Sequence, residues 1–124
     1  MHQFAIKAAE ASHCAQEQGK FWEMHDSMMA DQNTLDALDS HAESIHLDIA
    51  QFKTCLNADK YADSVRQDIA KAGELGINGT PSFVLARTDS EDPSRVKGLG
   101  LLRGAQPFSN FKQAIDQALA DPEQ

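Results

Sequence analysis

The chain has 124 residues, of which 41% are hydrophobic and 24% are charged, a composition typical of one soluble globular domain. Its formal net charge of −8 argues against nucleic acid and anionic membrane surfaces as partners, because phosphates and acidic lipids attract basic proteins. No apolar run approaches the roughly 20 residues of a membrane span, and the N-terminus lacks the apolar core and cleavage site of a signal peptide. The chain as written therefore predicts a cytoplasmic protein.

The first 76 residues are predicted to be helical, because their apolar residues recur at three- and four-residue spacing. Asp48 followed by Gln51 is typical of a capping box at a helix N-terminus. Gly76 is expected to end the last of these helices in the left-handed conformation. The five helices are expected over residues 3–18, 21–29, 34–45, 49–56 and 61–75.

The pattern changes after Pro81, where two short β-prone runs follow one another. Residues 82–86 and 96–103 are predicted to pair as an antiparallel hairpin across a long polar loop. Gly98 and Gly100 interrupt the second run, as glycines do in bent or bulged strands.

A last helix is predicted to begin with Pro107 in its first turn. Four apolar residues at helical spacing are expected to face inward: Phe108, Phe111, Ile115 and Leu119. The predicted fold class is therefore mostly α with a small antiparallel β-hairpin (α+β), in a single domain over residues 1–124.

Residues 76–83, Gly-Ile-Asn-Gly-Thr-Pro-Ser-Phe, resemble the cis-proline turn of DsbA-like thioredoxin-fold disulfide oxidoreductases. Other runs resemble parts of the same family, in the same order along the chain. Residues 14–26, Cys-Ala-Gln-Glu-Gln-Gly-Lys-Phe-Trp-Glu-Met-His-Asp, resemble the start of its helical insertion, and residues 52–56 and Val65 continue the pattern. Residues 104–107, Gly-Ala-Gln-Pro, resemble the turn into the family's C-terminal helix, so the resemblance covers nearly the whole chain.

The resemblance implies a partial thioredoxin-like fold, with a helical insertion over residues 1–76 and a cis-proline hairpin plus C-terminal helix over residues 77–124. In the family, a strand, a helix that begins with Cys-x-x-Cys and a second strand precede the region where this chain begins. The chain is therefore expected to be a truncated domain, and no catalytic residue is assigned to it. Family members are often exported, in contrast to the location expected from the chain as written.

The only two cysteines, Cys14 and Cys55, lie 41 positions apart and form no Cys-x-x-Cys motif. Cys14 falls near the C-terminal end of a predicted helix, where the helix dipole opposes a thiolate. The pair is therefore poorly suited to attack a disulfide. Three interpretations remain open: a structural disulfide, two reduced cysteines buried as small hydrophobic side chains, and an unorthodox redox pair.

Thr80 and Pro81 are the candidate substrate-binding residues. In the family, the cis-proline faces the redox cysteines and the backbone of the preceding residue pairs with the substrate peptide. The resemblance therefore implies a cis bond between Thr80 and Pro81, and a substrate that binds to both residues. An ordinary trans turn between helix and strand is the alternative.

The histidines show no spacing typical of a metal site, and no metal or other cofactor is expected. His25 lies on the apolar face of the second predicted helix and is expected at the edge of the core. Met24, Met28 and Met29 share that face with Phe21. This stripe is either core or an adaptable peptide-binding surface, because methionine side chains accommodate varied partners.

The first predicted strand, around residues 83–85, is expected to have an open apolar edge. The sequence therefore predicts self-association, most simply as a homodimer with two-fold symmetry. A peptide or protein substrate is the other expected partner. Two functions stay open: a member of the thiol-disulfide oxidoreductase family that is inactive as an isolated chain, or a non-enzymatic module that binds a peptide or protein through its helical face or cis-proline groove.

Overall fold

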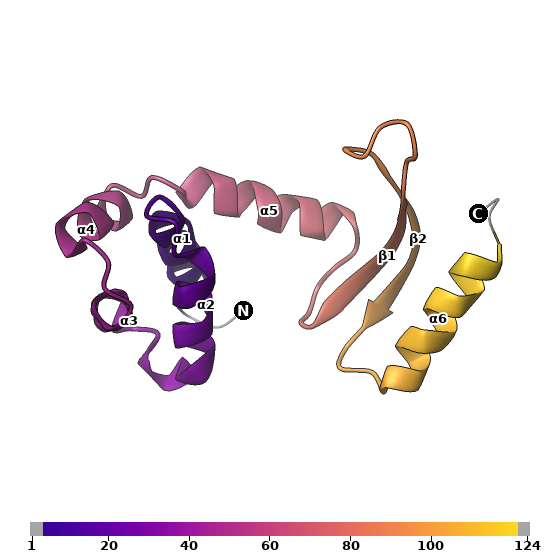
Figure 1. Ribbon diagram of the computed structural model, residues 1–124, viewed down its shortest axis with the longest axis horizontal. Coiled ribbons are helices and arrows are strands. Elements are labelled where there is room, and N and C mark those ends of the chain that lie inside the picture. Colours follow the sequence, from indigo (N-terminus) through magenta and orange to yellow (C-terminus); the bar gives the residue numbers. More distant parts are fainter. Residues whose placement is uncertain (1–3, 122–124) are drawn as a thin grey trace. The chain divides into compact units, whose positions relative to one another are not determined.

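The structure is a computed structural model that describes residues 4–121, and the chain divides between Leu75 and Gly76 into two compact units (Figure 1). The described residues form six α-helices, one 3-10 helix and a two-stranded antiparallel sheet. The chain is therefore mostly helical with a small β-hairpin, as the sequence predicts. None of the described helices has the length and apolar character needed to cross a membrane.

The first unit consists of helices alone, because its apolar residues follow the helical period from one end to the other. Its elements are α1 (Ala5–Gln16), α2 (Phe21–Ala30), the 3-10 helix η1 (Gln32–Thr34), α3 (Leu38–Ser44), α4 (Ile49–Asn57) and α5 (Ala62–Glu74).

The helix expected over residues 34–45 is shorter than predicted, because α3 begins only at Leu38. The Thr34 hydroxyl donates to the Asp31 carbonyl at 3.0 Å, and the Asp31 carboxylate accepts from the Asn33 amide at 3.2 Å. Such local bonds from side chains to backbone compete with α-helical hydrogen bonding and favour a tight 3-10 turn. The apolar spacing alone did not reveal this competition.

The core of the first unit lies where α1, α2, α3 and α4 meet. Ala11 and Ala15 on α1 are both fully buried, and their small side chains let neighbouring helices approach closely. Phe52 from α4 and Met24 from α2 are also completely buried, so they fill the largest part of this space. Burial of two such side chains is worth about 1.5–3 kcal/mol each.

The N-terminus of α4 is capped as predicted and tied to the end of α1. The Asp48 carboxylate accepts from the Gln51 amide at 2.9 Å, which is the first half of a capping box. The Asp48 amide donates instead to the side-chain oxygen of Gln18, at 2.7 Å. The Gln18 amide group in turn donates to the Asp48 carbonyl at 3.1 Å, so a residue 30 positions away completes the cap.

Three helices of the first unit end on a residue with left-handed backbone conformation, namely Gly19, His46 and Asp59 (φ 72°, 60° and 51°). Glycine adopts this conformation without steric cost, whereas a residue with a Cβ adopts it only with some strain. In each case the next amide donates to a carbonyl five positions earlier, as in a Schellman motif. These bonds are Lys20 to Ala15, Leu47 to Ala42 and Lys60 to Cys55.

The second unit pairs strand β1 (Ser82–Thr88) with strand β2 (Val96–Arg103) and ends with helix α6 (Phe108–Ala120). The register places Leu85 opposite Gly100 and Ala86 opposite Gly98, so the intervening residue of β2 is bulged. This bulge lies between the two glycines, where the sequence predicted an interruption. The first strand extends two residues beyond its predicted end, to Thr88.

Contacts from β1 hold α6 in the second unit. The Phe83 ring meets the Phe111 ring edge-on, with centroids 4.9 Å apart. The Arg87 guanidinium donates to the carbonyls of Ala118 and Asp121, which are at the C-terminal end of α6. A cation at this end complements the helix dipole and satisfies carbonyls that have no partner within the helix.

The prediction that four apolar residues of α6 face inward is wrong for three of them. Phe108, Ile115 and Leu119 are 80%, 45% and 72% exposed, whereas Phe111 is partly buried. A two-stranded sheet offers only a narrow face for the helix to cover. The partly buried positions of α6 are therefore Phe111 and two small residues further along the helix, Ala114 and Ala118.

Candidate functional site

The Thr80–Pro81 segment is anchored on both sides. The peptide bond between the two residues is cis. The Pro81 carbonyl accepts from the Gly104 amide at 2.8 Å, and the Ser82 hydroxyl donates to the Gly79 carbonyl at 2.7 Å. The first bond connects the turn before β1 to the turn after β2, and the second closes the turn before β1 on itself.

A further bond fixes the chain before the turn. The Arg103 guanidinium donates to the Gly76 carbonyl at 3.2 Å. Gly76 has a φ of 71°, so it ends α5 in the left-handed conformation that the sequence predicted. The candidate segment therefore lies between two points that are both tied to the end of β2.

Thr80 itself offers free backbone groups. Its side chain is exposed, and neither its N–H nor its C=O is hydrogen-bonded to another residue between 4 and 121. The adjoining strand β1 pairs on one edge with β2, and no other strand of the described chain pairs with its second edge. An extended polypeptide could therefore add to this edge through main-chain hydrogen bonds.

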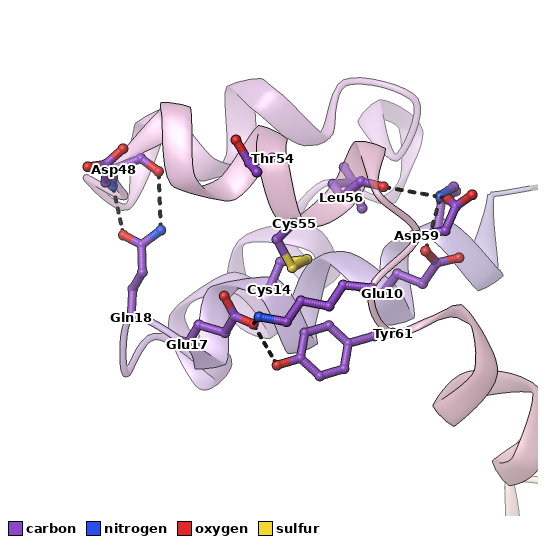
Figure 2. The surroundings of a disulfide bond; sticks show 12 residues. Glu10, Cys14, Glu17, Gln18, Asp48, Thr54, Cys55, Leu56, Asp59 and Tyr61 are labelled. Carbon is purple, nitrogen blue, oxygen red and sulfur yellow. Dashed lines mark hydrogen bonds and ion pairs between the residues drawn. A yellow bond between two sulfur atoms is a disulfide. The ribbon is translucent and has the colours of Figure 1, made fainter.

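The structure joins Cys14 and Cys55 in a disulfide, with Cα atoms 5.8 Å apart (Figure 2). Both residues are buried, at 1% and 5% exposed. Because the chain has only these two cysteines, the disulfide leaves no thiol for nucleophilic attack. This pair connects α1 to α4 and lies within the core of the first unit.

An ion pair and a hydrogen bond meet at Glu17, in the surroundings of the disulfide (Figure 2). The Lys60 ammonium and the Tyr61 hydroxyl both donate to the Glu17 carboxylate and stabilise its charged form. Lys60 and then Tyr61 therefore hold the pKa of Glu17 below its usual value, and Glu17 raises the pKa of Lys60. These contacts join the end of α1 to the turn before α5.

A second ion pair joins α1 to the same turn. The Lys7 ammonium contacts the Asp59 carboxylate, and it also donates to the buried Glu10 carboxylate at 3.0 Å. Lys7 lowers the pKa of Asp59, while Asp59 and then Glu10 raise the pKa of Lys7. The disulfide between α1 and α4 is thus accompanied by two charged contacts between the region of α1 and the turn that follows α4.

His41 is a structural residue in the first unit. It is buried, and the Thr34 hydroxyl lies 3.0 Å from its Nε2. Because this hydroxyl donates to the Asp31 carbonyl, it accepts from Nε2–H, and His41 Nδ1 accepts from the Ser27 hydroxyl at 2.8 Å. Both ring nitrogens of His41 therefore have hydrogen-bond partners within the first unit.

His25 and His46 lie apart from this network. The His25 ring is partly buried and contacts the Asp26 carboxylate at 2.9 Å, which agrees with its expected place at the edge of the core. His46 is exposed. Within residues 4–121, no three side chains of the metal-binding types are grouped closely enough to hold a metal ion.

The curated relatives that match the chain are long proteins. One is the Na(+)/H(+) antiporter NhaA 3 of Salinispora tropica, which is 36% identical over 101 residues, covering 80% of this chain and 16% of the relative. Another, the Na(+)/H(+) antiporter NhaA 1 of Salinispora arenicola, is 38% identical over 85 residues, which cover 67% of this chain and 13% of the relative. The chain thus spans about a sixth or less of these relatives. No solved structure matches it.

A protein-family model gives the wider match. The model for the DSBA-like thioredoxin domain matches residues 1–116, which include both cysteines, the Thr80–Pro81 segment and most of α6. The match agrees in position with the runs that the sequence shares with this family. The chain therefore belongs to the DSBA-like thioredoxin domain family.

Proposed function

We propose that this chain binds an extended polypeptide along Thr80 and the free edge of β1, as the substrate-binding part of a thiol-disulfide exchange domain. The unpaired backbone N–H and C=O of Thr80, in a segment anchored through Pro81 and Gly104, are the observation that carries the proposal. Main-chain pairing suits a protein that must accept many sequences, because it does not depend on the side chains of the ligand. Membership of the DSBA-like family supports the same assignment.

Exchange itself requires a thiolate, and the chain's own cysteines are an unsuitable source. Cys14 and Cys55 are buried and bonded to each other. A second thiol near the attacking one is also needed to resolve the mixed disulfide. We therefore assign the exchanging dithiol to polypeptide outside these 124 residues and expect the chain alone to be inactive. The alternative function is a peptide-binding module without redox chemistry, which would use the same edge.

The names of the curated relatives do not decide the activity. They describe sodium–proton antiporters, and this chain matches only a sixth or less of each. The disulfide does bear on location, since structural disulfides persist in oxidising compartments. It favours an oxidising environment for the folded chain over the cytoplasm.

The test of peptide binding uses NMR amide shifts of the intact, oxidised chain during titration with an extended peptide that contains serine in place of cysteine. Binding is expected to shift the amides of residues 79–88. Thr80→Pro removes the N–H donor and should weaken binding about fivefold to tenfold, the worth of one hydrogen bond. Thr80→Ala is the matched control and should bind as the native chain does, because it keeps the donor.

Two results would contradict the proposal. One is a set of shifts confined to residues outside 76–104, and the other is equal loss of binding in Thr80→Pro and Thr80→Ala. Native-like amide shifts of α6 and of the paired residues of β2 in each variant would show that the substitution has not unfolded the second unit.

We also propose that, in the absence of a peptide, β1 pairs through the same free edge with β1 of a second copy, as a two-fold dimer that a bound peptide would displace. None of the described side chains between 76 and 121 is buried. On β1, the apolar side chains of Phe83 and Val84 are 43% and 47% exposed. A two-stranded sheet is marginally stable, so a further strand on its open edge would add both hydrogen bonds and apolar contacts.

Sedimentation equilibrium tests this dimer. A dimer is expected at micromolar concentrations, and Val84→Lys should shift the chain toward monomer because a charged edge residue opposes pairing. Thr54→Lys adds the same charge on an exposed turn of α4 and should leave the dimer unchanged. A native chain that remains monomeric at micromolar concentrations would contradict the dimer without affecting the peptide site.

A further inference from the structure

An apolar groove of about 360 Å³ lies between α1 and α2 in the first unit. Its lining includes Ala8 and Ala9 from α1 and Phe21, Met28 and Met29 from α2, with few polar atoms. Met28 is mostly buried, but Met29 is 58% exposed, so part of this apolar surface faces solvent. The flexible thioether side chains can adapt to an incoming apolar group.

An acidic hollow adjoins this groove, because Leu35 lines both. This second hollow has a volume of about 480 Å³, and its charged lining residues are Asp36, Asp39, Asp59 and Lys7, so three carboxylates face one ammonium group. Asp39 forms an ion pair with Lys53 at 3.1 Å, and Asp59 forms one with Lys7. Asp36 makes no ion pair with any described residue, so its exposed carboxylate is available to a partner.

The charge of the surrounding surface points in the same direction. Residues 1–75 carry 13 Asp and Glu against six Lys and Arg, so most of the chain's net negative charge belongs to this unit. On α2 itself, Glu23 and Asp26 are exposed and no lysine or arginine occurs. An apolar ligand with basic flanks would therefore be attracted, whereas one with acidic flanks would be repelled.

We propose that this groove binds an amphipathic helical segment of a partner protein, with apolar side chains in the groove and Lys or Arg beside Asp36. Insertion of an amphipathic helix into an apolar groove is a recurring mode of recognition, with anchors spaced three or four residues apart. The surface belongs to the helical unit, so the inference goes beyond peptide addition at Thr80 and does not depend on it.

Trp22 provides a direct readout. It is the only tryptophan in the chain, it is 69% exposed, and its ring lies 5.2 Å from that of Phe21, which lines the groove. The probe is a synthetic peptide of Leu and Lys at helical spacing that lacks tryptophan, with a matched peptide of Leu and Glu as its control. The Lys peptide should shift the Trp22 emission, and the shift should reach a plateau as the peptide concentration rises. Added salt should weaken binding of this peptide. The Glu peptide should produce no shift.

Two variants with the same charge change locate the site. Met29→Glu places a carboxylate in the groove and should weaken binding of the Lys peptide about tenfold, because it removes an apolar anchor. Ile69→Glu changes an apolar residue of α5, 39% exposed and outside the groove lining, and should bind within about twofold of the native chain.

Equal effects of Met29→Glu and Ile69→Glu would overturn the proposal by showing that charge alone attracts the peptide. Equal binding of the Lys and Glu peptides would overturn the proposed preference for a basic partner. Self-association that Met29→Glu abolishes would assign the groove to a second copy instead. Thr80→Pro should leave Lys-peptide binding unchanged, so failure here is distinguishable from failure of the site at Thr80.

Discussion

At the scale of single residues, the helix ends of the first unit show where the sequence departs from its best local choice. His46 and Asp59 both occupy left-handed positions that glycine fills without cost, as Gly19 does at the end of α1. Their side chains differ in what they contribute. Asp59 pairs with Lys7, whereas the exposed His46 ring has no described contact.

Replacement of these two residues by glycine should therefore have different effects. His46→Gly relieves the left-handed Cβ and should stabilise the fold by about 0.5–1 kcal/mol, after the greater freedom of glycine in the unfolded chain is subtracted. Asp59→Gly gains the same relief but loses the ion pair, so its gain should be smaller. Chemical denaturation of both variants measures the difference, and greater stabilisation by Asp59→Gly would contradict this account.

At the scale of elements, short sequence motifs correctly predicted the features that depend on neighbouring residues, such as helix caps and bulges. The Asp48 cap and the β2 bulge between Gly98 and Gly100 were both predictable from the sequence, because each depends on residues within a few positions. The start of α3 was not, because the competing bonds of Asp31 and Thr34 leave no mark on the apolar spacing.

The inward face of α6 could not be predicted for a different reason. Its apolar residues cover more of the helix surface than the narrow sheet can contact, and the sequence does not say which of them the sheet will select. Ala118 lies toward β1 partly because Arg87 reaches its carbonyl, a contact over 31 positions. Whether Cys14 and Cys55 form a disulfide was likewise left open, since it depends on which faces of α1 and α4 meet.

The disulfide between α1 and α4 should contribute strongly to the stability of the helical unit. It closes a loop of 41 positions, and the chain-entropy model assigns such a bond about 4 kcal/mol. The double variant Cys14→Ala/Cys55→Ala should therefore unfold at much lower denaturant concentration than the native chain under oxidising conditions. Addition of a thiol reductant should destabilise only the native chain; equal destabilisation of both proteins would contradict this role.

At the scale of the whole molecule, family membership could be inferred from the sequence because short runs recur in the family's order, and the family model confirms it over residues 1–116. The same resemblance singled out Thr80 and Pro81 as the candidate substrate-binding residues, and this role stays a prediction. The free backbone of Thr80 and the groove of the helical unit could not be derived from those runs, because both depend on which neighbouring groups remain unpaired in space.

The central claim is that the two cysteines hold the fold together and do not exchange disulfides. The most direct measurement is the rate of insulin reduction by the intact chain in a dithiol buffer, beside Cys14→Ala/Cys55→Ala at a temperature where circular dichroism shows both to be folded. Both proteins are expected to match the rate of the buffer alone, since neither has a thiolate positioned for attack. A rate above background that disappears in the variant would contradict the claim and identify Cys14 and Cys55 as a redox pair.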